Sequence, residues 1–120
     1  MRCSLTVYAG TVAYDEDLAE RIRVLAPTTL PLAERKMFGG LCFMINGNMC
    51  FGIVGDELMV RVGPNSYVTA LARAHAREMD FNGRPMKGFV YVAAPGLRSD
   101  RSLTAWLARG LSFAESLPAK

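Results

Sequence analysis

The chain has 120 residues, of which 51% are hydrophobic and 21% are charged, and its formal net charge is +3 at pH 7. This size and composition are typical of one compact globular domain and exclude disordered, collagen-like and low-complexity classes. No apolar run approaches the ~18 residues that a membrane-spanning helix requires. The sequence predicts a single domain over residues 14–120, preceded by a poorly ordered extension over residues 1–13.

The excess of basic residues leaves nucleic-acid binding open, because positive surfaces attract phosphate backbones. The only adjacent bases are Arg35 and Lys36, so no basic stripe supports such binding. A dispersed charge of this size is also common in proteins that only need solubility.

The cysteine usage indicates a reducing compartment. Cys3, Cys42 and Cys50 form no C-x-x-C pair, and their odd number leaves at least one thiol free. We therefore expect a cytoplasmic protein without a structural disulfide.

The first predicted helix lies between Asp15 and Pro27. Apolar residues recur at helical spacing in this segment: Leu18, Ile22 and Leu25. Asp17 and Glu20 have the spacing of a capping box, and acidic side chains favour the positive end of a helix dipole. Helix-start chemistry thus accounts for the acidic cluster without a catalytic or metal-binding role.

An antiparallel meander is predicted next. Asn46 and Gly47 separate apolar runs at 41–45 and 49–54, and Gly55 and Asp56 lead into a third strand over residues 57–62. Asn-Gly between apolar runs is a strong hairpin signal because both residues tolerate positive φ. A two-residue turn at Asn46 would pair Phe43 with Cys50.

This register makes both faces of the meander apolar. An antiparallel sheet with one solvated face should instead alternate apolar and polar residues. We expect helices to cover one face and a second copy of the chain to cover the other, as a homodimer. The dimer interface predicted from the register consists of Leu41, Phe43, Ile45, Val54 and Met59, with Arg61 nearby.

The second half of the chain predicts a helix, two strands and a final helix. The helix follows Gly63 and Pro64 and ends near His75, and the strands cover residues 79–81 and 89–92. The last helix starts at Ser99 or Asp100 and buries residues at helical spacing: Leu103, Trp106, Leu107, Leu111, Ala114 and Leu117. The order of elements predicts a two-layer α+β domain with an antiparallel sheet.

Few residues could carry catalysis. His75 is the only histidine, so a multi-histidine metal site is excluded, and no glycine-rich phosphate loop is present. Cys42 or Cys50 could form a nucleophile pair with His75, but both lie in apolar strands where a small hydrophobic role is simpler. We expect no enzyme activity, no cofactor and no metal.

A mixed apolar and basic surface is the remaining candidate site. Basic residues and methionines lie close to glycines at the predicted loop edges: Arg35, Lys36, Met37, Arg61, Arg84, Met86 and Lys87. Such a surface could contact a protein partner, or DNA through the basic side chains.

Several segments resemble a known family. The runs at 35–44, 46–49, 58–63, 79–81 and 83–89 occur in the order found in the N-terminal domain of the TfoX/Sxy proteins. The resemblance implies the α+β sandwich of that family, which is also seen in secretion-chaperone-like domains. It further implies regulation of natural competence, as a coactivator that works with the cyclic-AMP receptor protein at certain promoters. It supplies no catalytic residues.

The functional expectation is therefore a non-enzymatic interaction module in transcriptional regulation that recognises a protein partner, DNA or both. A small ligand-binding protein or enzyme with a pocket between the sheet and the helices is the alternative. Full-length competence regulators of this family carry a second, helical domain in addition to the one that this chain resembles.

Overall fold

The structure, a computed structural model, describes residues 14–26, 31–37, 39–81 and 84–119, so the predicted extension at residues 1–13 lies outside the described part. It confirms the α+β class. The elements are α1 (Glu16–Leu25), β1 (Ala33–Met37), β2 (Gly40–Ile45), β3 (Asn48–Val54), β4 (Glu57–Arg61), η3 (Pro64–Ser66), α2 (Tyr67–Leu71), β5 (Ala76–Phe81), β6 (Arg84–Val92), η4 (Ala94–Leu97) and α3 (Asp100–Glu115).

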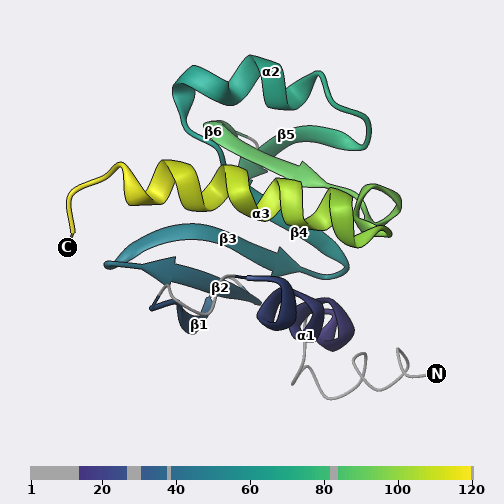
Figure 1. Ribbon diagram of the computed structural model, residues 1–120. Coiled ribbons are helices and arrows are strands. Elements are labelled where there is room, and N and C mark those ends of the chain that lie inside the picture. The colour runs from purple at the N-terminus through teal and green to yellow at the C-terminus, as the bar shows by residue number, and fades with distance from the viewer. Residues whose placement is uncertain (1–13, 27–30, 38, 82–83, 120) are drawn as a thin grey trace.

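The strands form one antiparallel sheet in the order β1-β2-β3-β4-β6-β5. Figure 1 shows α3 lying across the middle of the sheet, with α1 towards β1 and β2 and α2 beside β5 and β6. All three helices contribute to one hydrophobic core, as shown by the burial of Leu18, Ala70 and Leu103 in the same cluster. The domain therefore has two layers, with the described helices on one face of the sheet.

The helix α3 approaches the sheet closely at Gly110. A β-carbon at this position would lie 2.5 Å from the carbonyl oxygen of Cys50 and 3.0 Å from the ring of Phe51. Only glycine fits this crossing without a shift of the helix. The chain that follows α3 is tied back to the hairpin, because the amide of Asn48 donates a hydrogen bond to the carbonyl of Pro118 at 3.0 Å.

The helix boundaries follow from side-chain caps. The Asp15 carboxylate accepts hydrogen bonds from the backbone N–H groups of Asp17 and Leu18, at 2.9 and 3.2 Å. The sequence predicts the capping residue at Asp17, whereas the observed cap is Asp15, two residues earlier in the chain. The helix itself is confirmed. At α3, the Ser99 hydroxyl accepts a hydrogen bond from the backbone N–H of Ser102 and so caps the helix. This agrees with the predicted helix start at Ser99 or Asp100.

The second helix is shorter than predicted. It ends at Leu71, and the chain reaches β5 through His75, which has a left-handed φ of 68°. The strands β5 and β6 are longer than predicted, since they begin at Ala76 and Arg84.

Both predicted two-residue turns are confirmed. Asn46 and Gly47 have φ values of 53° and 82°, as a type I′ turn demands, and Ile45 pairs with Asn48 across them. The second turn has Gly55 at φ 61°.

The predicted register beyond the first turn is wrong, and a β-bulge is the reason. Met44 pairs with Met49, but Phe43 then pairs with Phe51, so Cys50 is an additional residue on β3. An extra residue shifts all later pairs by one and moves the side chains of one strand to the other face.

The shift overturns most of the predicted dimer interface. Leu41, Phe43 and Ile45 retain only 3%, 2% and 2% of their exposed surface and pack in the core beneath the helices. They cannot form an interface between folded copies. Val54 and Met59 point the other way, because their neighbours Ile53, Leu58 and Val60 belong to the helix-covered core.

Candidate functional site

The face of the sheet opposite the helices carries a second apolar cluster, which we call the open face. Its members are Cys42, Met49, Met59, Met79, Met86, Phe89 and Tyr91. Met44 pairs with Met49 and lies on the same side. Five of the seven methionines of the chain are therefore gathered here. No helix among the described residues covers this face.

The centre of the open face is well packed and its periphery is partly exposed. A β-carbon on Gly52 would lie 3.1 Å from the methyl group of Met59 and 3.3 Å from the sulfur of Cys42, so these side chains lie over the glycine. Met59 is 1% exposed, whereas Met44 and Met49 are only partly buried. The adaptable thioether side chains thus form the accessible part of this surface.

Arginines border the open face. Arg35 is paired with Cys42 at one edge. Towards the other edge, the guanidinium of Arg77 lies 4.6 Å from the ring centre of Tyr91 and forms an ion pair with Glu57. The face therefore has an apolar centre and a charged rim, the usual layout of a protein interface.

The structure does not bring the predicted basic surface together. Arg35 and Lys36 lie on β1, while Lys87 lies on β6, and three strands separate β1 from β6. Four strand spacings of ~4.8 Å place the two strands about 19 Å apart. Met37 and Arg84 are placed in β1 and β6 by their backbone, and their side chains lie outside the described part.

Arg61 has a different environment from the one expected. Its guanidinium carbon lies 5.7 Å from the ring centre of Phe89 and 5.3 Å from that of Phe113. It therefore bridges a strand and the end of α3 through cation–π contacts. Met86 packs against the apolar cluster of the open face instead of joining a basic patch.

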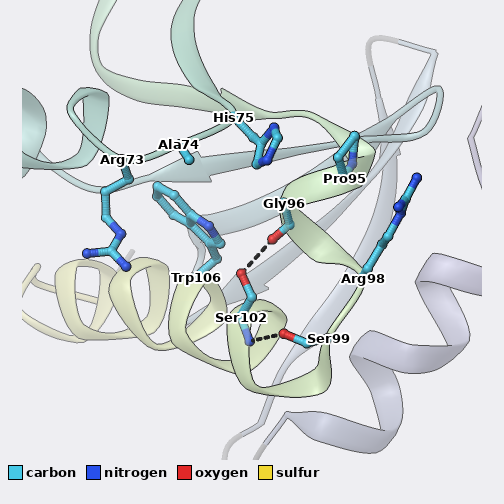
Figure 2. Close-up of a pocket in the computed structure, with 9 residues that line it drawn as sticks. All are labelled: Arg73, Ala74, His75, Pro95, Gly96, Arg98, Ser99, Ser102 and Trp106. Atoms are coloured by element: carbon cyan, nitrogen blue, oxygen red, sulfur yellow. Dashed lines mark hydrogen bonds between the residues drawn. The ribbon is translucent and has the colours of Figure 1, made fainter.

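A different basic region appears where α3 begins, and sequence reasoning missed it. Two adjoining hollows of about 310 and 330 Å³ share the side chains of Arg73, Ser99, Ser102 and Trp106. We call their basic residues the arginine cluster: Arg73, Arg98, Arg101 and Arg109. His75 lines the first hollow, and no carboxylate lines either one. Figure 2 shows Arg73 and Arg98 on opposite sides of the first hollow, with Trp106 between them.

Hydrogen bonds and close packing fix the floor of the first hollow. The Ser102 hydroxyl donates to the carbonyl oxygen of Gly96 at 2.5 Å, which joins α3 to η4 (Figure 2). A β-carbon on Gly96 would lie 2.9 Å from that of His75, so the two loops touch there. Arg109 lies over Trp106, with its guanidinium carbon 5.2 Å from the ring centre.

The spacing of residues in the sequence could have indicated two of the four arginines. Arg101 and Arg109 are eight residues apart, which places them on one side of the last helix. Arg73 and Arg98 join them only because the loop after α2 packs on η4, a tertiary contact that spacing does not reveal.

The thiols and the histidine lie in separate environments. Cys42 belongs to the open face and Cys50 to the helix-covered core, and both are free cysteines. Burial raises the pKa of the Cys42 thiol, and burial is also the main reason that the pKa of Cys50 is raised to about 11. His75 is exposed, and no hydrogen bond between described atoms joins it to either thiol. Within the described ranges there is no group of three or more residues that could hold a metal ion.

The geometry defines a small two-layer α+β domain with an apolar open sheet face and a separate basic cluster. A protein-family model described as the TfoX N-terminal domain matches residues 24–114. The chain therefore belongs to this family, and the resemblance noted in its sequence is confirmed. No curated protein and no solved structure gives a significant match. In the part of the chain that the structure describes, no helix is long and apolar enough to cross a membrane.

Proposed function

We propose that this chain is a non-enzymatic module of transcriptional regulation that binds a protein partner through the open face of its sheet. Membership of the TfoX N-terminal domain family supports a regulatory role. The finer role suggested by the resemblance is that of a coactivator in natural competence, working with the cyclic-AMP receptor protein.

The open face is the observation that carries the proposal. Strands buried on one side only normally present polar residues to solvent, whereas here Met44, Met49 and Phe89 are partly exposed around a buried apolar centre. Methionine-rich surfaces adapt to the shape of a partner, and a charged rim that includes Arg35 limits which partners fit.

The chemistry of the described residues also favours binding over catalysis. Both sheet thiols are buried with raised pKa values, so they hold little reactive thiolate at neutral pH. Free thiols are usual in a reducing compartment, which supports our placement of the module in the cytoplasm. A small ligand-binding protein is the alternative, for which a hollow of about 500 Å³ beside Phe113 would be the place to look.

Complementation in the source organism tests the proposal. Transcripts that change when the gene is deleted should be restored by the unaltered chain. A Met44→Lys/Met49→Lys variant should fail to restore them, because two charges would enter the accessible apolar part of the contact surface. The control is Val24→Lys/Val68→Lys, since these two side chains are apolar, 72% and 78% exposed, and lie on the helices.

Two outcomes would refute the proposal. Full restoration by the Met44→Lys/Met49→Lys variant would show that the open face is not the contact surface. An unchanged transcript pattern after deletion would remove the regulatory role itself. Thermal melting of both variants must first show that they remain folded.

A second copy of the chain is also a candidate occupant of the open face, since two-fold pairing is the commonest way to cover such a surface. Light scattering at micromolar concentration would then give twice the chain mass of 13.1 kDa. The Met44→Lys/Met49→Lys variant would return the mass to that of a monomer, and a monomer before mutation would exclude the homodimer.

A further inference from the structure

We propose that the arginine cluster at the start of α3 binds the phosphate backbone of duplex DNA. This site is separate from the open face, and the inference does not depend on the proposed function. It replaces the basic surface expected from the sequence, whose members lie on different strands.

The first argument is that the cluster has no internal counter-charge. Three arginines outside the cluster are neutralised by acids: Arg21 pairs with Asp100 at 3.1 Å, Arg23 with Glu20 and Glu34, and Arg77 with Glu57. The four arginines of the cluster form no ion pair with any described carboxylate. Four guanidinium groups held together without an acid favour an external anion.

The second argument is the shape of the site. The two hollows adjoin through Arg73 and Trp106 and are open to solvent. The arginine side chains therefore line a continuous surface instead of surrounding one small ligand. Arg101 and Arg109 extend this surface along α3 by two helical turns, or about 12 Å. A ligand with several phosphates in a row matches this arrangement better than a single phosphate does.

The third argument is the helix end. The α3 helix has 16 residues and is capped at its N-terminus by Ser99, which lines both hollows. Its positive dipole end adds to the charge of the arginines, and helix starts commonly contact phosphates in DNA complexes. Hydrogen bonds of Ser99 and Ser102 hold this end in place, so the surface is preorganised.

The scarcity of accessible rings favours duplex over single-stranded nucleic acid. Proteins that bind single strands stack successive bases on exposed aromatic side chains. Two aromatic rings line the hollows, and Trp106 is 4% exposed and covered by Arg109, so only the imidazole of His75 is accessible. A single small ring offers no platform for successive unstacked bases, so the site should contact phosphates and bind without strong sequence preference.

The test is a fluorescence anisotropy titration with a labelled duplex of 24 base pairs and arbitrary sequence, from 50 to 200 mM salt. We expect a dissociation constant at 50 mM salt that is at or below about 10⁻⁵ M and that rises steeply with salt, because counterions are released. An Arg98→Gln/Arg101→Gln variant should bind about tenfold or more weakly, and its salt slope should fall by about 1 to 2.

An Arg35→Gln/Lys87→Gln variant provides the matched control, since it loses the same charge from two exposed positions outside the cluster. Its affinity should stay within about twofold of the unaltered chain. Arg73→Gln, on the loop after α2, should weaken binding independently if the Arg98→Gln/Arg101→Gln variant fails to fold.

Three results would overturn the proposal. The unaltered chain could fail to bind the duplex at 50 mM salt. The two double variants could lose affinity equally, which would leave only a net-charge effect. A single-stranded oligonucleotide of the same length could bind more tightly than the duplex in a manner that depends on Arg98 and Arg101.

Discussion

Replacing Gly110 by alanine should destabilise the domain, although alanine is the better helix former. Helix propensity alone favours alanine by about 1 kcal/mol. The new methyl group, however, would lie 2.5 Å from the carbonyl oxygen of Cys50, which is a backbone atom of β3 and cannot rotate away. Relief requires a movement of α3 or β3 by nearly 1 Å, and such overpacking typically costs about 1 to 3 kcal/mol.

The net effect, overpacking less helix propensity, is a loss of up to about 2 kcal/mol in the free energy of unfolding, measured by urea denaturation with an unchanged m-value. Ala108 is exposed on the same helix, so Ala108→Gly serves as the propensity control and should cost about 1 kcal/mol. Both substitutions should therefore destabilise, whereas propensity alone assigns them opposite signs. A Gly110→Ala protein that is more stable than the unaltered chain would refute the close crossing of α3 and β3.

Further predictions concern buried and paired groups. Tyr67→Phe should stabilise the domain by about 1 kcal/mol, seen as a higher urea midpoint, because the buried Tyr67 hydroxyl has no hydrogen-bond partner among the described residues; a loss of stability would reveal a partner for that hydroxyl. In a variant without the N-terminal cysteine, Cys42 and Cys50 should react slowly with a disulfide reagent at pH 8 until the protein is unfolded, because burial raises both pKa values; rapid labelling of the folded protein would contradict this. Glu34→Gln should cost at most about 1 kcal/mol at pH 7, because the pair with Arg23 is partly exposed. Since Arg23 lowers the pKa of Glu34, this difference should persist above the ordinary carboxyl pKa and disappear as the pH falls through the lowered value; a difference that grows in acid would have the wrong sign.

The sequence predicted the elements well where local chemistry decides the structure. Asn46 and Gly47 require a tight turn because both tolerate positive φ, and the start of α3 follows from a serine cap before an apolar helical repeat. The element order and the family resemblance pointed to the same α+β fold.

The prediction of which side chains lie on which face of the sheet failed because it depended on one additional residue in β3. The bulge at Cys50 is invisible in an apolar run, where either register pairs apolar residues with apolar residues. Tertiary packing selects the observed register, since it places Phe43 and Phe51 under the helices with their ring centres 5.4 Å apart and puts Gly52 beneath Met59. The apolar second face was correctly expected, but most of its predicted members belong to the core.

The candidate site was only partly predictable for a related reason. Met59 and Val54 were expected on the uncovered face and lie there, whereas Arg35 and Lys87 were expected together and are separated by the strand order. Strand order and the packing of loops are long-range properties, and the spacing of residues along the chain does not encode them directly.

Site-specific photo-cross-linking in the source organism tests the central claim, that the open face is the contact surface, most directly. A photoreactive phenylalanine analogue at Met44 should form a covalent adduct with one discrete partner protein or with a second copy of the chain. The same analogue at Val24, which is 72% exposed on α1, should form no such adduct. The adduct at position 44 should also disappear when Met49→Lys is added. Identical adducts from both positions, or an adduct confined to position 24, would contradict the account.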